Sequence, residues 1–309
     1  MRRTCLDMIY ELACTDERVV FIGSDLGPGT LDEMRTGMPS RFYMEGVSEA
    51  NVIGMAAGMA LDGYVPYVNT IATFITRRCF EQVALDLCLH DLPVRLIGNG
   101  GGLVYAPLGP THMAIDDIAL MRTIPDMTVV APADAEEMRR FMVKSVDWPH
   151  PIYIRLGKGG DPIVSRDADG FTIGKAILLR DPGTIIIMAC GVMVNRALAA
   201  ADLLAAKGIE AGVLNLHTVK PLDEEAILAL AGRVDLLVTL DEHLLAGGLG
   251  AAVADVLIEQ EGRIPAAIHR IGIRDRFPDD YGSQDSLMRA FGLQPDQIAD
   301  SIIGRLGRL

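Results

Sequence analysis

The chain has 309 residues, of which 50% are hydrophobic and 22% charged, so it is long enough for two domains with separate cores. Its formal net charge of −13 argues against nucleic acid or an anionic membrane surface as the main partner, since both require basic patches. The five cysteines show no metal-ligand spacing, which predicts free thiols, no metal site on this chain and a cytoplasmic location. Asp7 and Glu11 interrupt the N-terminal residues before any apolar run, so we expect neither a signal peptide nor a membrane span.

Short β-rich runs alternate with helical patterns along the first 160 residues. Strands are predicted at 19–22, 65–68, 93–97, 127–130 and 152–154. Helices are predicted between them at 49–62, 73–89, 116–123 and 134–146. This alternation is typical of parallel strands with helices on both faces of the sheet.

A glycine-rich stretch at 157–162 ends this first series, and the alternation restarts after about residue 172. Strands are then predicted at 184–189, 210–216, 234–240 and 266–271, and helices at 193–207, 223–231, 248–261 and 295–306. We therefore predict an α/β protein with two doubly wound domains, residues 1–160 and 173–309, joined by a linker at 161–172. Because such folds host many chemistries, the function must be argued from individual residues.

Glu49 is the one acid in the small, apolar stretch 46–60. A carboxyl group in such surroundings is costly to bury without a partner, which makes Glu49 a candidate for proton chemistry. Taken alone, its position directly after Ser48 favours a simpler interpretation, with serine as the helix cap and glutamate favoured by the helix dipole.

A long glycine-rich loop, 99–112, follows the strand predicted at 93–97. Ligands in open α/β sheets bind beyond the carboxyl ends of strands, so this loop is a candidate binding segment. Its glycine spacing fits neither a dinucleotide fingerprint nor a phosphate-binding P-loop. His112, at its end, can donate a hydrogen bond or move a proton near neutral pH, or it can simply orient the loop.

Three more side chains are candidates on their chemistry alone. Phe74, near the start of the helix predicted at 73–89, can present a ring face to a planar heterocycle or can belong to the core. Arg155 and Lys158 flank the end of the first predicted domain. They can hold a phosphate or carboxylate, or can be part of an exposed linker.

Taken together, these segments resemble the C-terminal half of transketolase and of 1-deoxy-xylulose-5-phosphate synthase. Gly46–Glu49, Thr73–Arg77 and Gly109–His112 are similar to motifs of the family's first shared domain, and His217–Asp223 and Asp241–Gly250 to its C-terminal domain. The resemblance covers nearly the whole chain with the motifs in the right order. It implies a thiamine-diphosphate pyrimidine-binding domain followed by a transketolase C-terminal domain.

The resemblance also implies a role for each candidate residue. Glu49 would bond the pyrimidine ring and activate the cofactor, Phe74 would stack on that ring, and His112 would contact the donor sugar or the reaction intermediate. The other residues that the resemblance places at the site are Val47, Asp25 and Arg77 on the cofactor side, and Arg155, Lys158 and Leu108 on the substrate side.

The sequence departs from the family pattern in two ways. No Gly-Asp-Gly motif is present to hold Mg²⁺ and the diphosphate. The resemblance therefore implies a split enzyme in which a separate N-terminal-half subunit holds them, most simply in an α2β2 heterotetramer. The second departure is Leu108, which stands where transketolase has an aspartate that reads a donor hydroxyl. A leucine cannot accept a hydrogen bond, so the standard sugar-phosphate specificity does not follow for this chain.

The resemblance implies the pyrimidine-binding subunit of a transketolase-like enzyme that moves a two-carbon ketol unit from a ketose or ketose phosphate to an aldehyde. One alternative is the β subunit of the first component of a 2-oxo-acid dehydrogenase. Another is a condensing enzyme similar to deoxyxylulose-phosphate synthase, and a third is a non-catalytic subunit that retains the fold. The sequence identifies neither the donor nor the acceptor.

Overall fold

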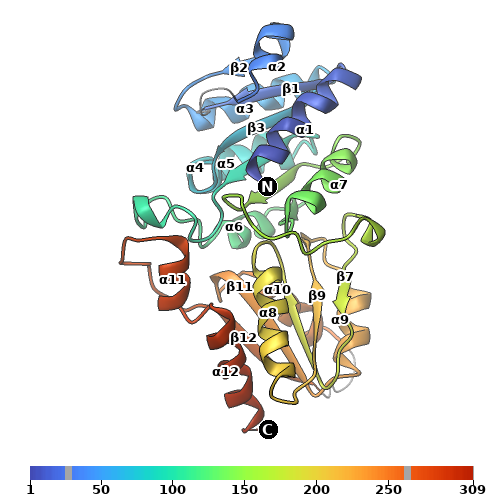
Figure 1. Cartoon of the computed structure of the whole chain (residues 1–309). Coiled ribbons are helices and arrows are strands. Elements are labelled where there is room, and N and C mark those ends of the chain that lie inside the picture. The colour runs from blue at the N-terminus through green and yellow to red at the C-terminus, as the bar shows by residue number, and fades with distance from the viewer. Residues whose placement is uncertain (25–29, 261–265, 309) are drawn as a thin grey trace.

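The computed structural model describes residues 1–24, 30–260 and 266–308, and it contains two β-sheets lying one beyond the other (Figure 1). We call residues 1–160 the first half and residues 173–309 the second half. In the described part of the chain, no helix combines the length and the apolar character needed to cross a membrane.

The first sheet has the strand order β10-β5-β6-β4-β3-β1-β2. Its strands pair in parallel except for β10, which runs antiparallel to β5. The bounds are β1 (Val19–Gly23), β2 (Phe42–Met44), β3 (Val65–Ile71), β4 (Arg95–Asn99), β5 (Thr128–Val130), β6 (Ile152–Leu156) and β10 (Thr218–Lys220). The helices of this half are α1 (Arg2–Thr15), α2 (Asp32–Gly37), α3 (Glu49–Leu61), α4 (Ala72–Arg77), α5 (Phe80–Gln82), α6 (Asp117–Thr123) and α7 (Ala135–Ser145).

The second sheet has the order β12-β11-β8-β9-β7, with β7 antiparallel to β9 at one edge and the other pairs parallel. Its strands are β7 (Ile177–Arg180), β8 (Ile185–Ala189), β9 (Ala211–Asn215), β11 (Leu236–Leu244) and β12 (Ala267–Ile273). Its helices are α8 (Met193–Ala205), α9 (Glu224–Ala231), α10 (Leu249–Ile258), α11 (Gln284–Ala290) and α12 (Pro295–Leu306). Short 3-10 turns lie at Pro39–Arg41, Ala106–Leu108 and Asp167–Asp169.

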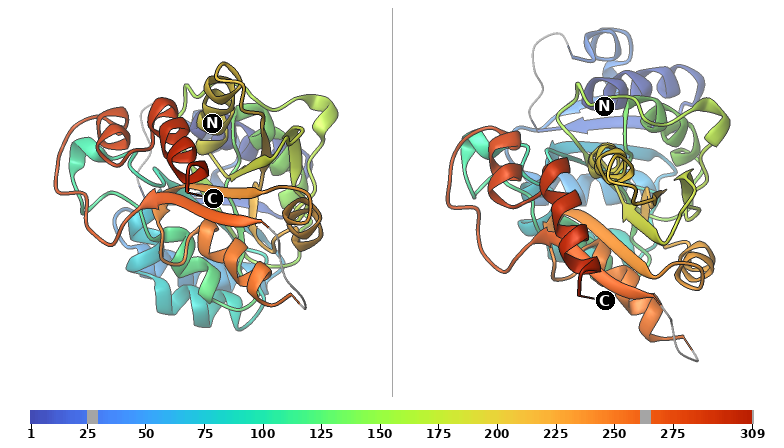
Figure 2. Two further views of the ribbon diagram at one scale, coloured as in Figure 1. Left: turned by 90° about the horizontal axis from the view of Figure 1, so that it is seen from below. Right: turned by 60° about the horizontal axis from the view of Figure 1, so that its bottom comes forward.

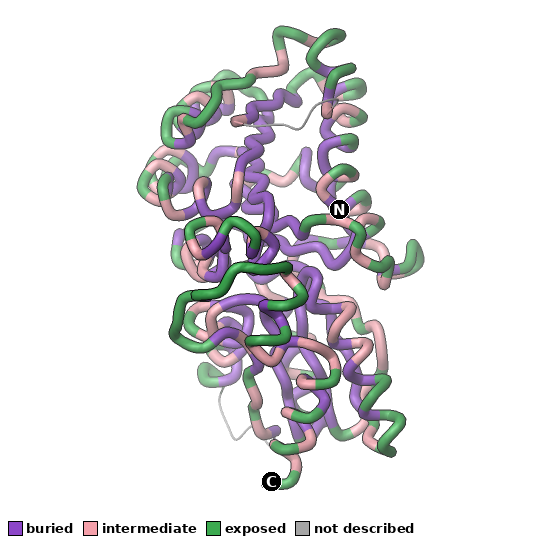
Figure 3. The backbone as a smooth tube through the Cα atoms, turned by 60° about the vertical axis from the view of Figure 1, so that its left-hand side comes forward, coloured by how far each residue is buried: buried purple, intermediate pink, exposed green. Residues whose placement is uncertain are grey.

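The central strands are buried on both faces, as parallel strands between two helical layers must be (Figure 3). This explains why they are readable in the sequence as continuous apolar runs. The predicted α/β class with two doubly wound units is confirmed. The short edge strands β2, β7 and β10 and helices α1, α2 and α11 were not predicted.

The helix predicted at 73–89 is broken into several pieces. Helix α4 ends at Arg77, α5 follows after a turn, and Val83–Cys88 form a π-helical turn. The Thr76 hydroxyl donates to the Ala72 carbonyl at 2.7 Å, a side-chain bond of the kind that bends helices. A π-helical turn often marks a functional site, and this one follows the predicted site residue Phe74.

The two halves are interlocked by β10, a strand of the second half that completes the first sheet. Lys220, at the end of β10, donates through Nζ to the carbonyls of Arg122 and Ile124 in the first half. Glu137 of α7 accepts a 2.7 Å hydrogen bond from the side chain of Asn215 in β9. The predicted linker thus joins two units that share a sheet and a polar core.

Candidate active site

The candidate residues come from the segments that follow three strands at one edge of the first sheet. Glu49 follows β2, Phe74 follows β3 and His112 follows β4. These three strands are parallel, so their carboxyl ends lie at the same edge, where open α/β sheets bind ligands. The fold thereby brings together side chains that are 63 positions apart in the sequence, from 49 to 112.

Glu49 begins α3, and its side chain is buried. The sequence predicts Ser48 as the helix cap, but its hydroxyl does not cap the helix. It donates instead to the carbonyl of Glu45 at 3.0 Å. The Glu49 carboxylate instead faces Arg78, whose Nη1 lies 3.4 Å from Oε1 and 3.5 Å from Oε2. An acid at a helix N-terminus beside a guanidinium has two sources of favourable electrostatic interaction for its charge.

Arg78 links Glu49 to Phe74. Its guanidinium carbon lies 3.7 Å from the centroid of the Phe74 ring, a cation–π contact. The Phe74 ring in turn meets the imidazole of His112 edge-on, with 5.1 Å between centroids and 65° between planes. Glu49, Arg78, Phe74 and His112 therefore form one continuous group. Arg78 was not predicted as a site residue, although its place four residues after Phe74, one helical turn, was visible in the sequence.

The loop that carries His112 is held at both ends of its last turn. Gly109 has φ +77°, a backbone conformation suited to glycine, and its carbonyl accepts from the His112 N–H at 3.1 Å. Arg77 forms an ion pair with Asp116, with Nη2 2.8 Å from Oδ1, and its Nη2 also donates to the Met113 carbonyl. Arg77, expected on the cofactor side, thus anchors the loop beyond His112.

The remaining predicted residues lie at different distances from this group. Val47 is exposed in the turn before α3, and Leu108 is half-exposed four residues before His112. Lys158 is exposed just beyond the end of β6. Asp25 belongs to the segment 25–29, which lies outside the described residues.

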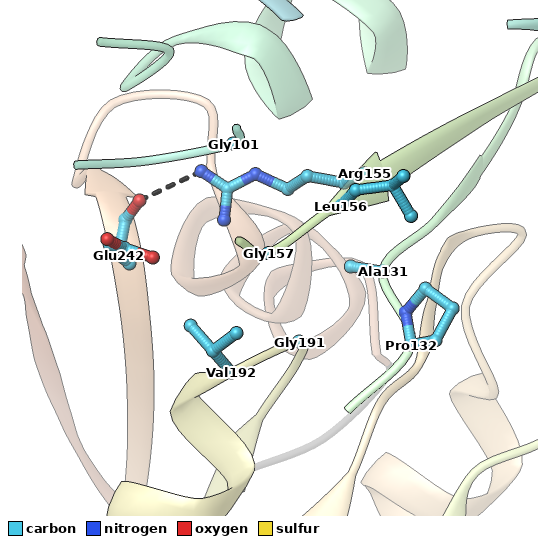
Figure 4. A pocket seen from close by; sticks show the side chains of 9 residues that line it. All are labelled: Gly101, Ala131, Pro132, Arg155, Leu156, Gly157, Gly191, Val192 and Glu242. Atoms are coloured by element: carbon cyan, nitrogen blue, oxygen red, sulfur yellow. Dashed lines mark hydrogen bonds between the residues drawn. The ribbon is translucent and has the colours of Figure 1, made fainter. Parts of the chain in front are cut away.

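Arg155 is buried between the two halves instead of lying with Glu49, Phe74 and His112. Its Nε donates to Asp117 at 2.8 Å, and its Nη2 donates to the Ala114 carbonyl at 3.1 Å. Nη2 also donates to the Glu242 carbonyl at 2.9 Å, as Figure 4 shows. Burial alone would raise the pKa of Asp117, but the charge of Arg155 holds that pKa below its usual value. Through Nε and Nη2, Arg155 thus joins β6, α6 and β11 inside the chain.

The group formed by Glu49, Arg78, Phe74 and His112 can bind a planar heterocycle. It offers a buried carboxylate that can exchange a proton with a ring nitrogen, an aromatic ring that can stack through the face not covered by Arg78, and an imidazole that can donate a hydrogen bond. Within residues 1–24, 30–260 and 266–308, no group of three or more acids, histidines and cysteines is arranged to hold a metal ion.

Known proteins match both halves of the chain. The family model described as "Transketolase, pyrimidine binding domain" matches residues 1–160, and the one described as "Transketolase, C-terminal domain" matches residues 174–298. A 6-deoxy-6-sulfo-D-fructose transketolase subunit SqwH from Clostridium sp. (strain MSTE9) is 39% identical over 299 residues, covering 96% of this chain and 92% of its own. One of the subunits of apulose-4-phosphate transketolase from Phocaeicola vulgatus is 35% identical over 307 residues, covering 98% of this chain and 96% of its own.

Longer relatives match over part of their length. A 1-deoxy-D-xylulose-5-phosphate synthase from Caldanaerobacter subterraneus is 36% identical over 300 residues, which are 96% of this chain but 47% of the synthase. Among solved structures, one described as "Split gene transketolase, inactive beta4 tetramer" superposes with a TM-score of 0.88 at 32% identity, covering 98% of this chain and 96% of its own.

Proposed function

The chain belongs to the transketolase family, and from this premise we propose that it is the pyrimidine-binding subunit of a split enzyme that transfers a two-carbon ketol unit from a ketose to an aldehyde. The predicted family is confirmed. The prediction of a transketolase-like, thiamine-diphosphate-dependent subunit is confirmed at the level of the family. The observation that carries the proposal is the continuous group Glu49, Arg78, Phe74 and His112 at the ligand-binding edge of the first sheet.

The side chains of this group fit the pyrimidine end of thiamine diphosphate. Glu49 would hold or release a proton at a ring nitrogen, Phe74 would stack on the ring, and Val47 would support it from the turn before α3. Arg78 balances the charge of the Glu49 carboxylate. When bound, the cofactor supplies the acyl-anion chemistry, and the protein supplies orientation and electrostatics.

The substrate would approach from the side of the 99–112 loop. His112 would donate a hydrogen bond to an oxygen of the donor, and its Nδ1 is already bonded to the Thr111 hydroxyl at 2.9 Å, which orients the ring. Lys158, exposed beyond β6, is our candidate for an anionic group at the far end of the substrate. The relatives named for sulfofructose and apulose 4-phosphate suggest a ketose with such a group.

We propose that a second subunit holds the diphosphate and Mg²⁺, most simply in an α2β2 heterotetramer. The outer face of α3 suits a partner, because a side chain added at Gly54 or Gly58 would meet nothing within 4 Å, so another chain can approach the helix closely. Exposed leucines lie at the end of α3 and in and directly after the π-helical turn that packs against it (Leu61, Leu85 and Leu89). We also propose a cytoplasmic location, which the free thiols support.

Reconstitution with the partner subunit tests the proposal. We expect the purified complex, supplied with thiamine diphosphate and Mg²⁺, to transfer a ketol unit from at least one ketose in a donor screen. Glu49→Ala should lower kcat by about a hundredfold or more, the range of a lost acid–base group. Glu45→Ala, which removes an exposed acid four residues away, is the matched control.

The outcomes separate the alternatives. Full turnover by the Glu49→Ala complex would show that cofactor activation does not use this residue and would favour a non-catalytic subunit. Release of CO₂ from a 2-oxo acid with an aldehyde acceptor, without ketose turnover, would favour the condensing reaction of the synthase relatives. Acyl transfer to a lipoyl group would instead identify a 2-oxo-acid dehydrogenase component.

A further inference from the structure

A segment of the second half packs against the loop that carries His112. Between β12 and α11 the chain reaches across to the 3-10 turn Ala106–Leu108 (Figures 1 and 2). There the Tyr281 ring covers Gly109 so closely that a Cβ added at this glycine would lie 2.6 Å from Tyr281 Cε1. The ring therefore rests on the backbone of Gly109, which directly follows Leu108 and begins the turn that ends at His112.

A buried carboxylate anchors both partners of this contact. Oε1 of Glu242, in β11, accepts from the Leu103 N–H at 2.8 Å, near the start of the loop. The same oxygen accepts from Gln284 Nε2 at 2.9 Å, three residues after Tyr281. One carboxylate oxygen is thus hydrogen-bonded both to the 99–112 loop and to Gln284 at the start of α11.

Tyr281 itself is not a core residue. Its side chain is 69% exposed, although one face lies on Gly109, and the neighbouring Leu108 is half-exposed. An aromatic side chain that is fixed on one face and open on the other is suited to contacting a ligand. Leu108 and Tyr281 thus present uncharged side chains from both halves of the chain, and two exposed acids, Asp279 and Asp280, directly precede Tyr281.

We propose that Tyr281 is a specificity-determining residue of the substrate entrance, by which we mean the side of the 99–112 loop from which the donor would approach. Its ring holds Gly109, and through Gly109 it fixes the positions of Leu108 and His112. Leu108 and Tyr281 offer no charged partner to an anionic group, and the acids Asp279 and Asp280 beside them would repel one, so this side favours donors whose anionic group lies elsewhere. This inference rests on the proposed function only in that His112 meets a substrate; the contact between Tyr281 and the loop does not depend on it.

Kinetics of the reconstituted complex test the role in specificity. Tyr281→Ala should raise KM for the ketose donor about tenfold or more with a smaller change in kcat, since misplacing a binding group is costly. Tyr281→Phe keeps the ring and should restore both constants to within about twofold. Phe277→Ala removes a 66% exposed aromatic from the same segment and is the matched control. Equal constants for Tyr281→Ala and Phe277→Ala would overturn the proposal.

Hydrogen exchange of the full chain tests the positioning without any turnover. Peptides spanning 104–113 should exchange on the order of tenfold faster in Tyr281→Ala than in Phe277→Ala. Gln284→Ala, which removes the link to Glu242 and leaves the tyrosine in place, should accelerate the same peptides if Tyr281→Ala does not fold. Unchanged exchange in the folded variants would overturn the positioning, whereas a wild-type complex inactive on every ketose would refute only the proposed function.

Discussion

Replacing Arg155 by methionine should destabilise the chain instead of weakening a substrate contact. The Arg155 side chain is 6% exposed, and the carboxylate of Asp117, 2.8 Å away, is 0% exposed. After the replacement, Asp117 would keep the hydroxyl of Tyr153 at 2.7 Å, with His243 Nε2 3.9 Å distant. Removing one partner of a buried ion pair costs about 3–5 kcal/mol, because the other charge stays buried without compensation.

Thermal unfolding of the full chain, followed by circular dichroism, measures this cost. A loss of that size corresponds to a melting temperature lower by roughly 6–20 °C. Arg289→Met is the control, because Arg289 pairs with Asp296 at 3.1 Å but the two side chains are 61% and 57% exposed. Breaking such a surface pair should cost about 0–1 kcal/mol. Adding Asp117→Asn to Arg155→Met should recover part of the loss by removing the stranded charge.

A different result would support the interpretation drawn from the sequence, in which Arg155 holds an anionic group of the substrate. If Arg155→Met melts at the wild-type temperature while KM for an anionic ketose rises tenfold, the guanidinium is a substrate ligand and its buried bonds are not what stabilises the junction. If both quantities are unchanged, the ion pair contributes neither to stability nor to binding, and the cost assigned to the buried carboxylate is wrong.

Two further predictions concern other positions. Burial, reinforced by the positive charge of Arg140, lowers the pKa of His217 from 6.5 to about 4. As pH falls through 6.5, His217 therefore takes up a proton in the unfolded chain but not in the folded chain, which lowers the free energy of unfolding. Between pH 7 and 4.5, urea unfolding should show the wild type losing about 2 kcal/mol more stability than His217→Gln. Equal losses in the two proteins would contradict this. Leu108→Asp adds an acceptor at the substrate entrance and should raise kcat/KM about tenfold for donors with a hydroxyl facing it, with Leu108→Asn as the uncharged control; an unchanged order of donors in the screen would refute the role of Leu108.

Where strand ends determine position, the sequence is sufficient to place candidate residues near one another. Continuous apolar runs identify parallel strands buried on both faces, and parallel strands place the residues that follow them at one edge. This local rule is sufficient to bring Glu49, Phe74 and His112 together, since each lies in the segment that follows a strand of the first sheet. The contact between Phe74 and His112 follows from the neighbouring positions of β3 and β4.

Contacts between distant segments could not be predicted in this way. Arg155 and Lys158 are three residues apart and chemically alike, yet one is buried and the other exposed. What distinguishes them is Asp117 on α6, a partner 38 positions away that no local pattern links to β6. Strand β10 was missed for a related reason, because its three residues gain their place by pairing with β5 across the junction.

The same long-range contacts separate two properties of the site. Glu49 and Phe74 are held by elements of the first half, whereas the loop leading to His112 is held by contacts from both halves. The Leu244 N–H donates to the Ile115 carbonyl at 2.8 Å, and Glu242 accepts from the Leu103 N–H. Substitutions in the second half can therefore move the 99–112 loop without disturbing Glu49 and Phe74, which are proposed to meet the cofactor. Under the proposed function, donor preference can therefore change while cofactor activation by Glu49 is retained, and the relatives named for sulfofructose and apulose 4-phosphate fit this expectation.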